Sequence, residues 1–295
     1  MALTAEQLAA GSGGWALPEA ERYLRQWGER YAEVFSVEQA LSHRETLAAL
    51  TPAAPVAVIA SAPADGALAC TVLAYDYPAL FSLITGLLGA AGFNTLSGDV
   101  FTSTPPPPAP ERRRRRVPRD TMKAARRYII DHFRGRCEGG EAVEPWAARL
   151  RTQLCGIVGL LETGRPEAAV RARHLVYEQV ARRMAALTAR GEAMLYPVEL
   201  QVSNDGPFTR LEVRAQDTPF FLYSLANALA LRGITIERVA IHTTATGQVA
   251  DCIDILDAGG RRIEDPRQLD ELRFSVALTK QFTYCLGTAH DPYAA

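Results

Sequence analysis

The residues best suited to chemistry in this chain are two aspartates that each stand two positions before a proline. Asp76 precedes Pro78 and Asp217 precedes Pro219, and apolar residues at helical spacing follow each proline. Proline is well tolerated at the start of a helix, whose first turn presents unpaired backbone N–H groups that can receive a carboxylate. The aspartates themselves can hold an amino group or cap the helix, and the sequence leaves these two roles open.

Other residue types that support catalysis lack the spacing that catalysis requires. The five histidines show no HExxH pattern, the five cysteines include no CxxC pair, and no nucleophile–base pair is visible. We interpret Asp251, Asp254 and Asp257 as a solvent-facing sheet edge and turn. We therefore expect no catalytic residues, no metal and no cofactor, and we expect that the chain is not an enzyme.

Composition narrows the classes of partner. The chain has 32 basic and 33 acidic residues, so its overall charge favours neither nucleic acid nor an anionic membrane. It contains no apolar run long enough for a membrane helix, and its first residues lack the pattern of a secretory signal. We expect a cytoplasmic protein that binds neither membrane nor nucleic acid.

An internal repeat organises the chain. Four residues recur at a constant separation of 141 positions. They are Asp76, Pro78, Gly92 and Thr102 in the first copy and Asp217, Pro219, Gly233 and Thr243 in the second. The match resumes at a separation of 123, where Tyr128–Asp131 resembles Asp251–Asp254. The first copy therefore carries 18 extra residues, which we place around the proline- and arginine-rich insertion 104–120.

Each copy has the element order β-α-β-β-α. The expected later elements are strands Asn94–Thr102 and Arg127–Phe133 with helix Val143–Glu162, then strands Ile234–Thr243 and Val249–Leu256 with helix Asp265–Phe282. This order is one strand short of the ferredoxin-like βαββαβ unit. We expect an α+β fold of two such units with antiparallel sheets, an N-terminal helical segment and a linking helix, Pro166–Arg190.

The missing sixth strand has a candidate before each copy. Pro197–Asn204 lies where it can close the sheet of the first copy, and nothing after the second copy reads as a strand. We therefore expect Pro55–Ala62 to pair in the second sheet, so that the copies complete each other. An open sheet edge is the alternative, and such an edge invites a partner strand.

These boundaries give four parts. They are an N-terminal helical segment (1–54), a first α/β domain (55–164) with the insertion 104–120, a linking helix (165–196) and a second α/β domain (197–295). Apolar residues at helical spacing in the first part, such as Trp27 and Tyr31, favour packing against the sheets over docking of a partner.

The repeated motif resembles the ACT-domain signature. Asp76–Phe81 with Gly92–Asn94 follows its pattern of aspartate, any residue, proline, glycine and leucine, then a helix and glycine-x-asparagine. Asp217–Tyr223 with Gly233–Ile236 is similar. The lead-in Pro197–Asp217 resembles that of the ACT pair in bacterial uridylyltransferase/uridylyl-removing enzymes of nitrogen control. The tandem region attached to some glutamine-synthetase adenylyltransferases is also similar.

The resemblance implies a sensor of an amino acid, glutamine in the nitrogen-control case, bound at an interface between domains. The implied ligand-binding residues are Asp76, Ala79, Leu80, Asn94, Asp217, Phe220, Phe221 and Thr235. Ala79 and Phe220 replace the family's glycine, which lets a ligand approach the backbone. Because phenylalanine should obstruct this approach, the first site is expected to bind in preference to the second.

Two functions remain open. The preferred one is a regulatory protein that senses an amino acid and acts on a nitrogen-metabolism enzyme, a uridylyl- or adenylyltransferase. The alternative is a ligand-independent module that docks a partner through a sheet edge or through the loop Arg112–Arg116. That loop has no interleaved aromatic residues for base stacking, which argues against nucleic acid. A homodimer is compatible with either function.

Overall fold

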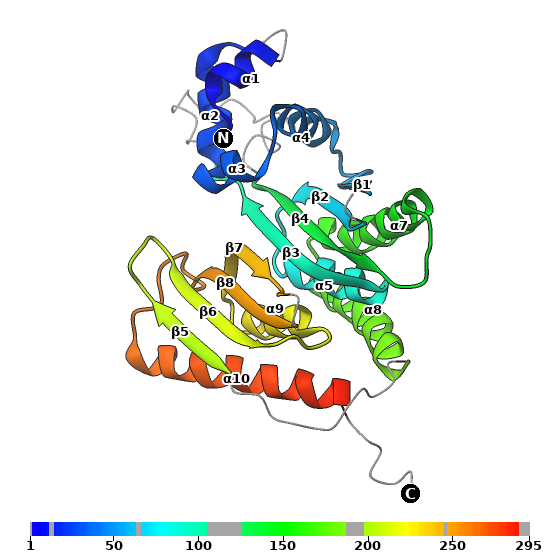
Figure 1. Ribbon diagram of the computed structural model, residues 1–295, viewed down its shortest axis with the longest axis vertical. Coiled ribbons are helices and arrows are strands. Elements are labelled where there is room, and N and C mark those ends of the chain that lie inside the picture. The colour runs from blue at the N-terminus through cyan, green and yellow to red at the C-terminus, as the bar shows by residue number, and fades with distance from the viewer. Residues whose placement is uncertain are drawn as a thin grey trace, which may run out of the picture.

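The computed structural model describes residues 2–11, 15–62, 66–104, 126–186, 198–244 and 247–288, with side chains up to residue 283. Its fold class is α+β, and in the described ranges eight strands form one antiparallel sheet (Figure 1). The strands are β1 (Val56–Ser61), β2 (Leu68–Tyr75), β3 (Phe93–Thr102), β4 (Tyr128–Cys137), β5 (Glu199–Ser203), β6 (Thr209–Gln216), β7 (Thr235–His242) and β8 (Gln248–Leu256). The loop Arg112–Arg116 lies outside the described residues.

The helices flank this sheet on both faces. They are α1 (Ala5–Gly11), α2 (Leu17–Trp27), α3 (Glu29–Val34), α4 (Val37–Ala49), α5 (Leu80–Ala90), α7 (Val143–Glu162), α8 (Pro166–Ala185), α9 (Phe221–Leu231) and α10 (Pro266–Thr288). The periodicity-based prediction for α7 is confirmed, and that for α10 differs from the structure at both ends. Helix α8 begins at the expected residue, Pro166, whereas its expected end, Arg190, lies outside the described residues. None of the described helices is both long and apolar enough to cross a membrane.

The sheet consists of two matching halves. Its strand order is β1-β2-β4-β3-β7-β8-β6-β5, so the first half contributes β1 to β4 and the second half contributes β5 to β8. Strands β3 and β7 join the halves in antiparallel register, from Ser97 opposite His242 to Phe101 opposite Arg238. The two halves therefore share one continuous sheet.

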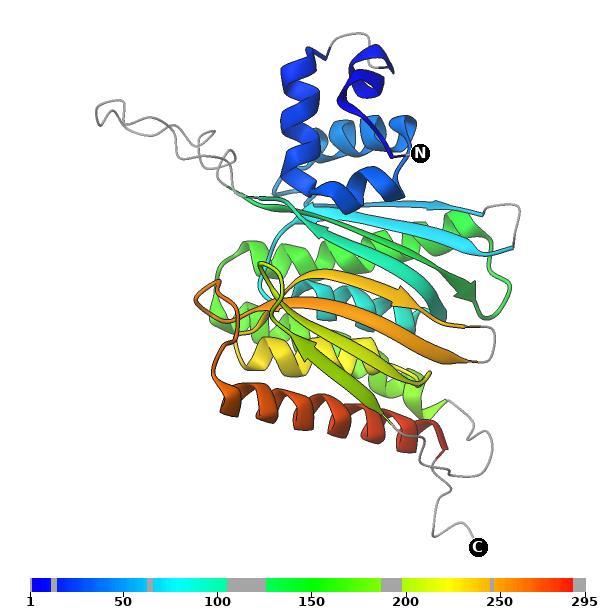
Figure 2. The ribbon, with the colours of Figure 1, turned by 60° about the vertical axis from the view of Figure 1, so that its left-hand side comes forward.

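Alternating side chains supply one core on each face of the sheet. Val72 of β2 faces a core built with α5 and α7 to α10, whereas its neighbour Leu73 faces a second core built with α1 to α4. Figure 2 shows the N-terminal helices and the later helices on opposite sides of the sheet. In the second core, Tyr31 and Trp27 stack with ring centroids 5.7 Å apart.

The expected exchange of closing strands is wrong. Strand β1 pairs with β2, from Val56 opposite Ala74 to Ser61 opposite Ala69, and β5 pairs with β6 in the same way. Each lead-in strand thus completes the sheet of its own half. The physical reason is loop closure, because a hairpin joins adjacent strands through a short loop, whereas exchange requires longer connections with a larger entropic cost.

The expected alignment of the third strands is also wrong. Asp131 lies opposite Val72, and Asp251 lies opposite Val213, the residue that matches Val72 in the repeat. Asp131 therefore corresponds to Asp251 and not to Asp254, at a separation of 120 positions. The insertion in the first copy is accordingly 21 residues, the difference between separations of 141 and 120. A shift of three residues turns every side chain to the opposite face, so the sequence match alone selected the wrong aspartate.

Candidate functional site

Two pockets lie at the junction of the halves, and each draws residues from both. We call them the Asp217 pocket, with a volume of about 250 Å³, and the Asp76 pocket, with a volume of about 350 Å³. In each pocket, the turn that carries the aspartate–proline motif of one half faces the start of the strand that follows the motif helix in the other half, which is β3 or β7. Asn94 of the first half thus lies with Asp217, and Thr235 of the second half lies with Asp76.

All eight residues that the sequence analysis proposed for ligand binding line one of these pockets. The Asp217 pocket contains Asn94, Asp217, Phe220 and Phe221, and the Asp76 pocket contains Asp76, Ala79, Leu80 and Thr235. Sequence reasoning did not predict the crossed pairing, because the repeat places each motif turn and the following strand in the same copy. The β3–β7 junction and the packing of α5 against α9 bring the two copies together.

The turn before each helix places a residue in a conformation that glycine favours. Ala79 (φ 64°) and Phe220 (φ 58°) adopt the left-handed conformation as N-cap residues of α5 and α9. Glycine takes this conformation without steric cost, whereas alanine and phenylalanine do not. Neither N-cap residue accepts a side-chain hydrogen bond, and the aspartates stand three positions earlier. Asp76 and Asp217 therefore do not occupy the N-cap position.

Asp76 belongs to an ion-pair chain that links the halves. Arg127 Nε lies 3.5 Å from the carboxylate of Asp76, and Arg127 Nη2 lies 2.6 Å from the carboxylate of Glu237 on β7. Burial raises the pKa of Asp76, and the charge of Arg127 opposes this rise. Because Arg127 is shared between two carboxylates, it neutralises the Asp76 pocket only in part.

Asp131 is a buried acid that the sequence analysis missed. It lines the Asp76 pocket, its exposed fraction is 1%, and neither carboxylate oxygen has a hydrogen-bond partner among the described residues. Burial raises its pKa well above the ordinary value, and the nearby charge of Asp76 raises it further. An unpaired buried carboxyl is costly, so its presence in a pocket points to a function.

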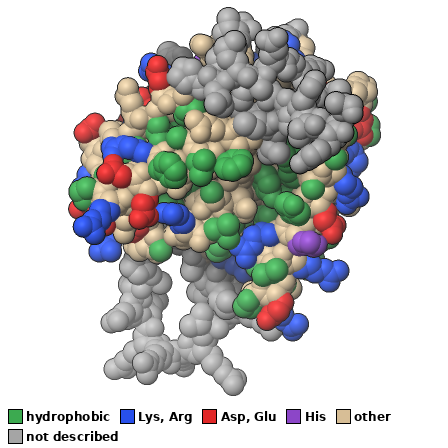
Figure 3. All heavy atoms as spheres, turned by 90° about the horizontal axis from the view of Figure 1, so that it is seen from below, with side chains coloured by type: hydrophobic (Ala, Val, Ile, Leu, Met, Phe, Trp, Pro, Cys, Tyr) green, Lys and Arg blue, Asp and Glu red, His purple; other side chains and the backbone are tan. Residues whose placement is uncertain are grey.

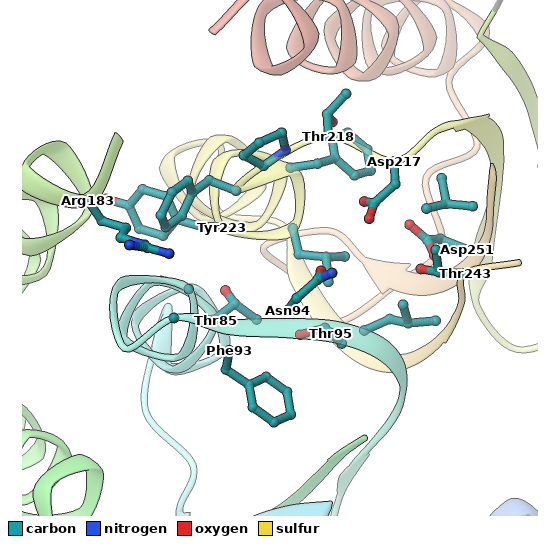
Figure 4. A pocket seen from close by; sticks show the side chains of 18 of the residues that line it. Thr85, Phe93, Asn94, Thr95, Arg183, Asp217, Thr218, Tyr223, Thr243 and Asp251 are labelled. Atoms are coloured by element: carbon teal, nitrogen blue, oxygen red, sulfur yellow. The ribbon is translucent and has the colours of Figure 1, made fainter. Parts of the chain in front are cut away.

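The Asp217 pocket has an equivalent acid with a partner. Asp251 is 3% exposed, contrary to the expected solvent-facing edge, and it interacts electrostatically with Lys280 of α10. Burial raises the pKa of Asp251 and lowers that of Lys280. The Lys280 ammonium lies 4.0 Å from the centroid of the Phe221 ring, and Asp217 also attracts it. Figure 4 shows Asp217 and Asp251 pointing into the same region of the pocket.

The two pockets also differ in their guanidinium groups. Arg183 of α8 lines the Asp217 pocket and pairs with Glu138. Arg173 precedes Arg183 by ten residues on α8 and lines the Asp76 pocket. It makes no hydrogen bond or ion pair with the described residues. The Asp76 pocket thus holds a carboxyl and a guanidinium that have no partner in the described part of the chain. These are the complements of an ammonium and a carboxylate, the two charged groups of an amino acid.

Some of these residues could have been found from the sequence. Asp131 interrupts the apolar strand run Tyr128–Phe133, and Lys280 follows Leu272 and Val276 at a four-residue spacing. A charged residue at an otherwise buried position is the available signal in both cases. Arg173 offers no such signal, since basic residues are frequent along the exposed side of α8.

The chain is similar to part of several curated proteins. It is 27% identical over 201 residues to the bifunctional uridylyltransferase/uridylyl-removing enzyme of Rhodopseudomonas palustris, a match that covers 66% of this chain and 18% of the relative. It is 24% identical over 272 residues to the enzyme of the same name from Rhodospirillum rubrum, covering 91% of this chain and 26% of the relative. The chain thus spans about a fifth to a quarter of these relatives. No family model and no solved structure matches it.

Proposed function

We propose that the chain is a tandem ACT regulatory region that senses an amino acid, with residues 55–164 and 197–295 as the two domains and glutamine as the first candidate ligand. The crossed composition of the two junction pockets is the observation that carries the proposal. The similarity to uridylyltransferase/uridylyl-removing enzymes supports a regulatory role in nitrogen metabolism.

The regulatory mechanism that fits this geometry is a population shift. A ligand in a pocket lined by both halves favours the packing in which the pocket is formed, and it disfavours packings that separate the walls. A uridylyl- or adenylyltransferase would respond to that packing, either as part of a longer chain or as a separate cytoplasmic protein. The role needs no catalytic residue, metal or cofactor in the chain itself.

A thermal-shift screen of the purified chain against the twenty amino acids tests the proposal. A ligand at a hundred times its dissociation constant adds about 2.7 kcal/mol to the free energy of unfolding, which raises the melting temperature by several degrees. Thr235→Ala should remove the shift if the ligand binds in the Asp76 pocket, and Asn94→Ala should remove it if the ligand binds in the Asp217 pocket. The absence of a shift with all twenty would contradict amino-acid sensing.

A ligand-independent docking module is the second candidate function. Phe274, Leu278 and Phe282 recur every four residues along α10, with exposed fractions of 69%, 40% and 62%. Hydrophobic side chains gather on the face of the molecule that carries α10 (Figure 3). Strands β1 and β5 end the sheet and offer edges to a partner strand. If this second function holds, the chain should bind its partner without any added amino acid. Phe274→Ser and Phe282→Ser should then abolish that binding.

A further inference from the structure

The two junction pockets contain equivalent aspartates with different surroundings. Asp131 and Asp251 face the same core from matching positions on β4 and β8. Asp251 has the ammonium of Lys280 as an electrostatic partner. Neither carboxylate oxygen of Asp131 has a hydrogen-bond partner among the described residues, and the nearby charge of Asp76 has the same sign. Asp251 therefore has a cation of the chain as an electrostatic partner, whereas Asp131 has no hydrogen-bond partner in the part of the chain that the structure describes.

Helices α7 and α10, which follow β4 and β8 in the two halves, differ in the residues that they bury. Buried residues follow a four-residue spacing in both helices: Leu150, Leu154 and Val158 in α7, and Leu272, Val276 and Lys280 in α10. We align these two sets at a separation of 122 positions, close to the 120 positions that separate Asp131 from Asp251, and in this alignment Val158 corresponds to Lys280. A fully buried apolar residue thus stands where the other half supplies an ammonium group.

We propose that Asp131 receives the ammonium group of the sensed amino acid in the Asp76 pocket, and that Lys280 supplies the equivalent ammonium to Asp251 in the Asp217 pocket. The inference rests on the proposed function and adds to it the location and number of sites. Arg173 is the counter-charge for the ligand's carboxylate in the Asp76 pocket. Because Lys280 already supplies the ammonium that Asp251 attracts, we expect only the Asp76 pocket to bind an amino acid, so one chain binds one amino acid.

The first arm of the test measures ligand binding calorimetrically. The full chain is titrated with the amino acid that gives the largest thermal shift, and one site per chain is expected. Asp131→Asn should weaken binding at least tenfold, because an amide cannot pair with an ammonium as a carboxylate does. Val158→Lys should abolish binding by placing an internal ammonium beside Asp131. Val158→Met, which has similar length but no charge, should stay within about threefold of the wild type.

The second arm needs no ligand. The melting temperatures of Val158→Lys, Asp131→Asn and the double variant are compared with that of the wild-type chain. If Asp131 accepts an ammonium at this position, Val158→Lys should lower the melting temperature by at least about 5 °C more in the Asp131→Asn background than in the wild type. Thermal unfolding remains measurable even where a variant is too weak for titration.

The two arms separate the inference from the proposed function. Binding at two sites per chain, or binding unaffected by Asp131→Asn and Val158→Lys, would overturn the inference while leaving amino-acid sensing intact. Equal effects of Val158→Lys in both backgrounds would also overturn it. Thermal coupling without binding of any amino acid would reject the proposed function, yet it would support Asp131 as the acceptor of an ammonium group.

Discussion

Gly86 of α5 and Tyr223 of α9 mark a close approach between helices of the two halves. A Cβ atom placed on Gly86 would lie 2.7 Å from Cδ2 of Tyr223 and 2.6 Å from Cγ1 of Val176 on α8. Three helices therefore meet at a residue that has no side chain. Since Tyr223 also lines the Asp217 pocket, this contact connects the packing of the halves with the shape of a candidate ligand site.

Gly86→Ala should destabilise the chain by about 1–3 kcal/mol, because the added methyl group forces three packed helices apart. Chemical denaturation measures this change in the free energy of unfolding. The matched control is Gly159→Ala in α7, where a Cβ atom meets nothing within 4 Å. There the higher helix propensity of alanine should stabilise by up to about 1 kcal/mol. Equal effects of the two substitutions would contradict the packing described for Gly86.

Ala79→Gly should stabilise the chain by about 1 kcal/mol. Ala79 has a φ of 64°, and glycine takes this left-handed conformation without the steric cost that a Cβ atom carries. Thermal or chemical denaturation gives the difference. Ala181→Gly within α8 is the opposite case, because glycine in a helix interior costs about 1 kcal/mol relative to alanine. A loss of stability from both substitutions would argue against the left-handed turn at residue 79.

The repeat and its periodicity predicted the order of elements correctly, since that information is local. The bounds of α7, Val143–Glu162, follow from helical spacing and need no knowledge of neighbours. The partner of β1 does not follow in this way, because every strand can pair with several others. The entropic cost of closing a loop decides between them, and the short loop between β1 and β2 favours their pairing as a hairpin.

The residues proposed for ligand binding line the two pockets, but their arrangement in space was not predicted. Asp76 and Asp217 were identified by their motif, yet the partner of each, Thr235 and Asn94, comes from the other half. The pairing of β3 with β7 brings residues of the two halves together, and neither strand has a sequence motif that predicts this pairing. Asp131 was misaligned because two aspartates three positions apart compete in the repeat, and only the register of the sheet separates them.

Acid should destabilise the N-terminal helical region through His43. The ring is 3% exposed, its Nδ1 lies 2.9 Å from the Tyr31 hydroxyl, and burial lowers its pKa to about 4. The folded state then binds fewer protons than the unfolded state between pH 6.5 and 4, so stability falls as pH falls through this window. The loss should reach about 3 kcal/mol.

Denaturation of His43→Gln across pH 4 to 7 checks this prediction. The variant should show a shallower dependence of stability on pH than the wild-type chain, whatever its stability at pH 7. His174→Gln, which changes an exposed histidine of α8, is the matched control for the substitution itself. An unaltered slope in His43→Gln would mean that another group governs the acid response.

The side chain of Asp131 should affect stability in the opposite direction to His43, because its contribution to stability falls as pH rises. Burial and the charge of Asp76 raise the pKa of Asp131, so the folded chain holds this proton at pH values where the unfolded chain has lost it. Stability contributed by this group is present below about pH 4, the ordinary value for an aspartate, and it is lost as pH rises toward the folded pKa. Asparagine resembles the protonated acid and does not titrate.

The variant should therefore match the wild-type chain near pH 4 and exceed its stability at pH 7, by at least about 1 kcal/mol. Denaturation at both pH values measures the difference, with Asp270→Asn as a control at a carboxylate whose side chain is 76% exposed. Because an amino acid bound in the Asp76 pocket would favour the ionised form of Asp131, saturating ligand should reduce this difference at pH 7. A variant less stable than the wild type at pH 7 would show that the Asp131 carboxylate is already paired in the free chain.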